Sequence, residues 1–178
     1  MDDVVVDACC LINLLAAGEI RERLSKLRGK WYVPSAVASE ALYLHVELED
    51  GTVNKLRVDL GNLVDDGVLL SCTANPGEEL DLYVDLATRL DDGEAMALAI
   101  AKTRSWTLST DDGKAKRIAR EIGVNVLTTP EIMKRWAELA SPDSAELGAV
   151  LKRIELRASF FPAVSDPLHA WWRKSIIE

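Results

Sequence analysis

Four acidic residues stand at positions where a carboxylate is costly unless something binds it. Asp7 follows a run of three valines, and Asp111 comes shortly after a second apolar stretch. Glu40 lies among apolar positions with helical spacing, and Glu94 opens an alanine-rich segment. Burial of an unpaired carboxylate costs several kcal/mol, so such a group needs a cation, a hydrogen-bond donor or a proton. The four acids together indicate one metal-binding cluster.

Carboxylate oxygens are hard ligands, which select Mg²⁺ or Mn²⁺ over zinc. One or two such ions activate a water molecule and stabilise charge on the oxygens of a scissile phosphate. The outcome is hydrolysis of a phosphodiester bond without a nucleophile from the protein. The residues expected both to bind the metal and to act in catalysis are Asp7, Glu40, Glu94 and Asp111.

Three of these acids also have an ordinary interpretation as residues at the start of a helix. Asp7 would cap the helix that follows it, although three residues separate it from the expected helix start. Asp92 would cap a later helix, and Glu94 in its first turn would gain about 0.3–1 kcal/mol from the helix dipole. Capping by Asp111 or Asp112 is the alternative for the fourth segment. Capping explains each acid alone but less easily all of them, because their mutual repulsion is unfavourable without a cation.

Glu40 has a different alternative. If residues 35–44 form a helix, Glu40 shares a sector with Val37 and Leu44 and points inward. If the helical phase differs, its carboxylate lies instead at a solvated edge.

The elements that would position these acids alternate between strands and helices. Strands are expected at residues 4–7, 31–33, 68–71, 106–109 and 124–127, and helices at residues 11–17, 19–27, 35–44, 80–90, 93–102 and around 115–122. The alternation predicts a parallel sheet with helices on both sides, a three-layer α/β/α fold. Ligands of such sheets bind beyond the carboxyl ends of the strands, where Asp7 and Asp111 are expected.

The strand pattern stops after residue 130, and helices are expected near residues 130–140, 144–157 and 166–177. We therefore expect a domain over residues 1–130 and a helical extension over residues 131–178. No Gly/Ser-rich linker separates them, which favours an extension packed on the same domain. An apolar stripe that includes Trp171 and Trp172 is expected to seal the core, with a homodimer or inhibitor interface as the alternative.

The bulk composition narrows the classes of protein. A chain of 178 residues, 48% of them hydrophobic, suits one globular unit. A net charge of −8 argues against tight binding of polyanions by the whole surface, so a nucleic-acid function needs local basic patches. The lack of a CxxC motif, a basic signal-peptide start and a membrane-spanning run favours a cytoplasmic protein. No glycine-rich phosphate loop indicates an NTPase or a dehydrogenase.

The order and surroundings of the four acids resemble the PIN domain, the compact nuclease fold of VapC-type toxins and of RNA-processing enzymes. The similar segments are residues 4–8 with 11–14, residues 34–40, residues 93–99 and residues 108–112. The resemblance extends over about residues 3–130. Three departures are Cys9, where many members carry a small polar residue, the segment after Asp111, which lacks the Asp-Phe ending common in VapC toxins, and the helical extension over residues 131–178.

The resemblance implies an endoribonuclease that uses Mg²⁺ or Mn²⁺ to cleave single-stranded or structured RNA. It implies the same four catalytic acids, with Ser109 and Asp112 as supporting contacts. An antitoxin is the implied partner if the protein is the toxin of a toxin–antitoxin pair. A second hypothesis, from a different class, is a catalytically weak PIN scaffold that acts by binding a protein partner. Basic residues near Asp112, such as Lys114 and Arg117, would contact phosphates or simply form a solvated helix face.

Overall fold

The computed structural model describes residues 3–40, 42–48 and 50–177. The chain forms two compact units, each discontinuous in sequence. The first unit comprises residues 1–11, 28–40 and 59–128, and the second comprises residues 12–27, 41–58 and 129–178. The last segment of the second unit begins close to the predicted domain boundary, and its packing on the sheet domain stays a prediction.

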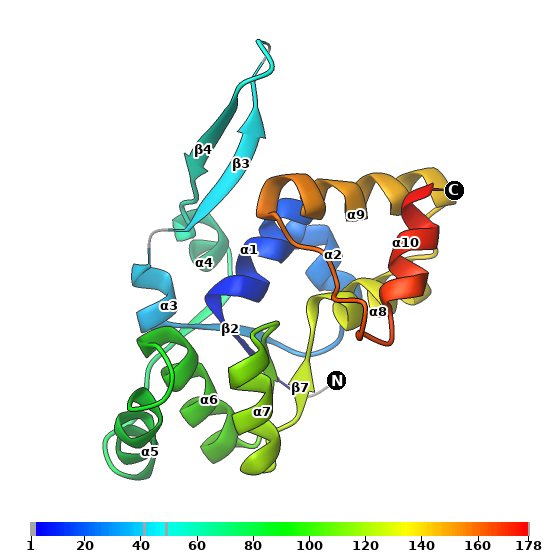
Figure 1. Cartoon of the computed structure of the whole chain (residues 1–178). Coiled ribbons are helices and arrows are strands. Elements are labelled where there is room, and N and C mark those ends of the chain that lie inside the picture. Colours follow the sequence, from blue (N-terminus) through cyan, green and yellow to red (C-terminus); the bar gives the residue numbers. More distant parts are fainter. Residues whose placement is uncertain (1–2, 41, 49, 178) are drawn as a thin grey trace. The chain divides into compact units, whose positions relative to one another are not determined.

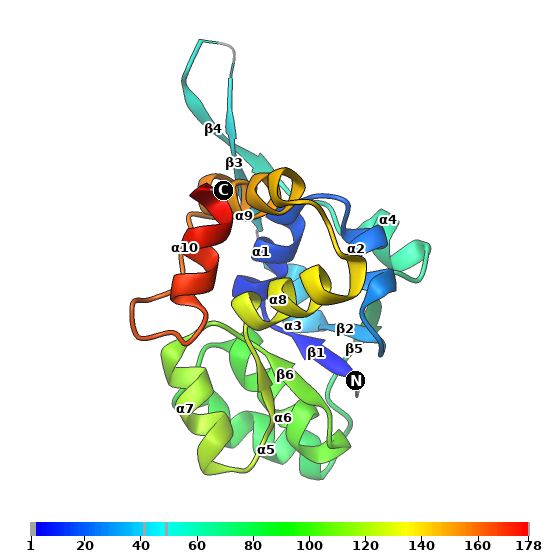
Figure 2. The same ribbon diagram turned by 90° about the vertical axis from the view of Figure 1, so that its right-hand side faces the viewer.

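The first unit is built on a five-stranded parallel sheet (Figure 2). Its strands, in spatial order, are β5 (Leu70–Cys72), β2 (Trp31–Pro34), β1 (Val4–Val6), β6 (Thr107–Ser109) and β7 (Val126–Leu127). All three residues of the central strand β1 are fully buried. Because successive side chains of a strand point to opposite faces, both faces of β1 are covered. The pairing of β1 with β6 sets Val6 opposite Ser109, so the carboxyl ends of these two strands lie together.

Helices flank this sheet (Figure 1). Those of the first unit are α3 (Ser35–Ser39), α4 (Gly61–Asp65), α5 (Glu78–Ala87), α6 (Asp92–Arg104) and α7 (Gly113–Glu121). Helix α6 contacts β1, β2 and β6 and packs beside α5 and α7. Its alanines at positions 95, 97, 99 and 101 are buried, and such small side chains let the helix approach the strands closely. The predicted α/β class, with a parallel sheet flanked by helices, is confirmed.

The second unit contains helices and one two-stranded hairpin. Helix α1 (Ala8–Ala17) begins in the first unit and continues into the second, where it is followed by α2 (Ile20–Lys26), β3 (Tyr43–Glu47), β4 (Val53–Arg57), α8 (Thr129–Ala140), α9 (Ser144–Ala158) and α10 (His169–Ile177). The guanidinium of Arg23 lies 4.2 Å from the ring centroid of Trp136. Trp172 is fully buried and its Nε1 donates to Glu155 Oε1 at 3.2 Å, so this tryptophan packs inside the unit. None of the helices in the described part of the chain is both long and apolar enough to cross a membrane.

The main departure from prediction lies between α3 and α4. The helix expected over residues 35–44 ends at Ser39, and β3 pairs antiparallel with β4. The turn between these strands explains the difference, because Asp50 Oδ1 accepts the N–H of Thr52 at 2.9 Å. Gly51 has a φ of 79°, in the left-handed region that favours glycine. Asp50 and Gly51 are therefore a hairpin signal that outweighs the helical spacing of Val37, Glu40 and Leu44.

Candidate active site

Asp7 stands between β1 and α1, and it is only 2% exposed. Its backbone N–H donates to the carbonyl of Ser109 on β6 at 3.0 Å. Its Oδ1 accepts the backbone N–H of Cys10 at 3.0 Å, which is the bond of a helix N-cap. The capping interpretation therefore holds for Asp7, because α1 begins at Ala8 and not at residue 11 as predicted. Capping also fixes the carboxylate at the end of the central strand.

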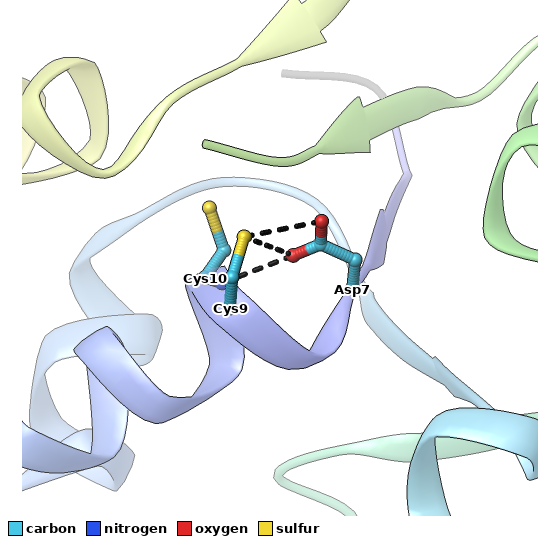
Figure 3. A group of neighbouring side chains, drawn as sticks. All are labelled: Asp7, Cys9 and Cys10. Carbon is cyan, nitrogen blue, oxygen red and sulfur yellow. Dashed lines mark hydrogen bonds between the residues drawn. The ribbon is translucent and has the colours of Figure 1, made fainter. Parts of the chain in front are cut away.

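Two adjacent thiols lie at the start of α1, and Figure 3 shows the thiol of Cys9 against the carboxylate of Asp7. Cys9 Sγ lies 3.0 Å from Oδ1 and 3.2 Å from Oδ2 of Asp7. Cys10 Sγ lies 3.1 Å from Oδ2 of Asp111, whose backbone N–H donates to Cys9 Sγ at 3.3 Å. A hydrogen bond from the Cys10 thiol is the main cause that lowers the pKa of Cys9 to about 7, whereas burial raises the pKa of Cys10. The thiols thus join the ends of β1 and β6.

The segment after β6 supplies a hydroxyl and a second cap. Thr110 is fully buried, and its Oγ1 accepts the N–H of Asp112 at 3.1 Å. Burial raises the pKa of Asp7 well above its ordinary value, and the hydrogen bond from Thr110 partly opposes that rise. Asp112 Oδ1 accepts the N–H groups of Lys114 and Ala115 at 2.7 and 2.8 Å. Asp112, and not its neighbour at position 111, is therefore the N-cap of α7.

Glu94 lies on the first turn of α6 and is half-buried. The N-cap of this helix is Asp91, whose Oδ1 accepts the Glu94 N–H at 2.8 Å, so the prediction that Asp92 caps it is wrong. Burial, followed by the charge of Asp91, raises the pKa of Glu94 to about 7. The charges of Asp112 and Asp7 contribute to the same rise. The Glu94 carboxylate is therefore within electrostatic reach of acids from the ends of β1 and β6.

Glu40 does not point inward from a helix as predicted, because α3 ends one residue before it and the residue is exposed. Its Oε1 lies instead against Gly93 of α6, in the space that a Cβ at that position would fill. The carboxylate is desolvated there, and this burial, with the charges of Asp91 and Asp92, raises the pKa of Glu40. Glu40 thus joins the acids at the start of α6.

Ser109, one of the two predicted supporting residues, is fully buried at the end of β6. The Ser109 carbonyl accepts the backbone N–H of Asp7, while the Ser109 Oγ has no hydrogen-bond partner among the described residues. An unpaired buried hydroxyl costs about 1–3 kcal/mol. Its supporting role stays a prediction.

The tightest group of ligand atoms in this region combines oxygen with sulfur. One ligand atom from each of Asp7, Cys9 and Cys10 lies within 4.8 Å of the other two, and the described residues form no second group of this kind. The other three predicted ligands lie outside it. Asp111 Oδ2 accepts a hydrogen bond from the Cys10 thiol of this group. Glu94 interacts with the group through the charge of Asp7, which contributes to the raised pKa of Glu94.

Comparison with known families gives the fold its name. Residues 3–157 match a family described as a PIN domain. The chain belongs to the PIN-domain family. The PIN domain is a nuclease fold, so the predicted resemblance is confirmed. The match extends beyond the predicted residue 130 into α9. None of the curated proteins matches the chain.

Three acids of this PIN domain have surroundings that a divalent cation would make more favourable. Among the ion pairs of the described residues, none involves Asp7, Glu40 or Glu94. Burial is the main cause that raises the pKa of each of the three, followed by Cys9 for Asp7 and by neighbouring carboxylates for Glu40 and Glu94. A cation would reverse that balance, and oxygen ligands suit Mg²⁺ or Mn²⁺. The two thiols are the departure, since sulfur suits softer metals.

Sequence reasoning missed three contributors to this PIN site. Asp91 stands three residues before Glu94, which is the spacing of a capping box, so that signal was available. Nothing in the sequence pointed to Thr110 beyond its place in the segment of residues 108–112 that resembles the PIN domain. Cys9 and Cys10 lack the spacing of a zinc motif, and only the start of α1 brings them to the acids.

Proposed function

We propose that the chain is a Mg²⁺- or Mn²⁺-dependent endoribonuclease. The observation that supports the proposal is a set of acids in a PIN domain, Asp7, Glu40 and Glu94, that take part in none of the ion pairs of the described residues. They come from the end of β1, the end of α3 and the start of α6, and burial is the main cause that raises the pKa of each. Nuclease sites gather acids in this way to hold a cation at the scissile phosphate.

The roles of the side chains follow from their surroundings. Asp7, held by the Cys10 N–H, offers a fixed carboxylate to the cation, and Asp111 and Glu40 offer further oxygens. Glu94, whose pKa is raised to about 7 by burial and neighbouring acids, offers a carboxylate that a bound cation would keep in its charged form. The ion would also polarise the phosphate and acidify the attacking water. Asp112 is occupied by its cap and positions α7 beside the site.

The proposed substrate is RNA, whose phosphates need positively charged side chains to bind them. In this acidic chain such side chains are available only in local patches. Helix α7 begins at the site and carries Lys114, Arg117 and Arg120 on its exposed side. Arg117 is paired with Glu121 at 3.2 Å, so Lys114 and Arg120 are the better candidates for phosphate contacts.

A narrower form of the proposal is that this nuclease is the toxin of a toxin–antitoxin pair. A toxin needs a surface for its antitoxin, and the β3–β4 hairpin exposes apolar side chains such as Val53 (66% exposed) and Leu56 (59% exposed). Induced expression then arrests growth, and the Asp7→Asn variant does not. Equal growth of cells that express the two proteins would contradict the toxin role.

A catalytically weak scaffold is the second candidate, and one observation favours it. The group of ligand atoms within 4.8 Å contains two thiols where a hard cation would prefer oxygens. Calorimetric titration with Mn²⁺ separates the candidates. Stoichiometric heat that is lost in Glu94→Gln supports the nuclease, whereas no binding at millimolar metal supports the scaffold.

A circular single-stranded RNA tests the proposed activity, because it has no ends for an exonuclease. We expect the protein to open the circle with Mn²⁺ and to leave it intact with a chelator. A circle that stays closed while a linear RNA of the same sequence is degraded would replace the endonuclease with an exonuclease. No cleavage of either RNA would refute the proposal.

A further inference from the structure

We infer that Cys9, Cys10 and Asp7 form a binding site for a thiophilic divalent cation of the zinc and cadmium class. The inference concerns binding by the chain and does not depend on nuclease activity. It starts from the observation that one ligand atom from each of the three residues lies within 4.8 Å of the other two (Figure 3).

The spacing of these atoms suits a tetrahedral ion. Ligands at ordinary Zn–S and Zn–O distances are about 3.6–3.8 Å apart in a tetrahedral site. Cys9 Sγ lies 3.0 Å from one Asp7 oxygen and 3.2 Å from the other. All three ligand atoms therefore reach a common ion with shifts of about 1 Å or less. Each thiol that binds the ion gives up its proton to water.

The two sulfur atoms give the group of three a soft set of ligands. Thiolate sulfur selects zinc-class ions over Mg²⁺, and a carboxylate oxygen is an ordinary further ligand of zinc. Cys10 and Asp7 are buried, whereas Cys9 is half-buried, so one ligand of the group borders the solvent. Asp111 Oδ2 lies 3.1 Å from Cys10 Sγ but outside the group, and water would fill the remaining coordination position.

Oxidation of the two thiols to a disulfide is a weaker alternative. Consecutive Cα atoms are about 3.8 Å apart, whereas disulfide-linked Cα atoms are usually about 4.4–6.8 Å apart. Cys9 and Cys10 both lie within α1, so a bond between them would require that turn to unwind. Metal binding leaves the helix intact.

The site shares Asp7 with the proposed catalytic centre. A thiophilic ion bound there would exclude Mn²⁺ from Asp7, a consequence that rests on the proposed function. Binding itself is measured separately, so the failure of either claim is distinguishable from failure of the other.

The test is titration of the reduced full chain with Cd²⁺, followed by the ultraviolet charge-transfer absorption of cadmium thiolate. We expect one equivalent to bind. Cys9→Ser and Cys10→Ala should each weaken the affinity by about tenfold or more, since even loss of an outer-shell contact costs 10–100-fold. Cys72→Ser is the matched control, because Cys72 is the remaining cysteine of the chain and lies outside the group.

Circular dichroism confirms that each variant is folded. No thiolate band in the wild type, an unchanged band in both Cys9→Ser and Cys10→Ala, or its loss in Cys72→Ser would overturn the inference. A normal band in a protein that cleaves no RNA would leave the site standing and reject the nuclease.

Discussion

The thiol of Cys9 and the carboxylate of Asp7 are in direct contact, with Sγ 3.0 Å from Oδ1 and 3.2 Å from Oδ2. The same carboxylate caps α1 through the N–H of Cys10. The first turn of the helix therefore holds the acid in place with one thiol and one amide. Asp7 therefore has two roles, as the N-cap of α1 and as a proposed ligand of the catalytic metal. Tests of Asp7 must separate the effect of its charge from the effect of its capping hydrogen bond.

Removal of the Glu94 charge should stabilise the metal-free protein at alkaline pH. The folded-state pKa of about 7 lies above the ordinary 4.5, so the folded protein binds this proton more tightly than the unfolded chain. Stability is therefore lost as pH rises from about 4.5 to about 7. Glu94→Gln removes that loss, and the melting temperature at pH 8 should rise by about 2–4 °C per kcal/mol of repulsion relieved.

Thermal unfolding followed by circular dichroism, with a chelator present, measures this effect. At pH 4 the variant and the wild type should melt alike. Glu121→Gln is the control for which the stability change should have the opposite sign. The hydrogen bond from Arg89 lowers the pKa of Glu121, so loss of the Glu121 charge should destabilise the protein. An equal gain for Glu94→Gln at both pH values would contradict the explanation.

Two substitutions of Asp91 should separate its cap from its charge. Asp91→Ala removes the bond to the Glu94 N–H and should lower the free energy of unfolding by about 1 kcal/mol. Asp91→Asn keeps a capping oxygen but removes the charge that contributes most to the raised pKa of Glu94, so that pKa should fall below about 7. Denaturant unfolding and carboxyl NMR titration measure the two effects. Loss of the same stability in both variants would show that the cap does not matter.

A methyl group at position 93 should displace Glu40. The Cβ of Gly93→Ala would overlap Glu40 Oε1, the far end of an exposed and flexible side chain, and would lie 3.2 Å from Val37 Cγ2. The side chain can swing away, so stability should change by no more than about 1 kcal/mol while cleavage falls. Gly113→Ala is the matched control, since nothing lies within 4 Å of its Cβ. Unchanged cleavage in Gly93→Ala would remove Glu40 from the site.

Much of the fold could be predicted because its signals are local and strong. The three valines before Asp7 indicated a strand covered on both faces, and β1 is buried throughout. The alanine-rich composition of α6 and the apolar periodicity of α7 likewise predicted these two helices. Strand β3 was missed because Val37 and Leu44 have a spacing that also suits a helix, and the choice depends on pairing between strands.

The site was harder to predict because side-chain direction depends on where helices begin and end. Glu40 was expected inside a helix, yet its carboxylate reaches Gly93 only because α3 stops at Ser39. The contact between Cys9 and Asp7 depends on α1 beginning at Ala8, a shift of three residues from prediction. Shifts of this size alter which atoms meet without altering the fold.

The most direct test of the account is the rate at which the Asp7→Asn variant cleaves single-stranded RNA with Mn²⁺. Asparagine keeps an oxygen for the cap of α1 but loses the charge, so the variant should fold as the wild type does. Asp143→Asn makes the same exchange at the cap of α9, where Asp143 Oδ1 accepts the Glu146 N–H at 2.8 Å. We predict that Asp7→Asn loses at least about 100-fold in rate while Asp143→Asn keeps the wild-type rate. A folded Asp7→Asn protein with the wild-type rate would contradict the central claim.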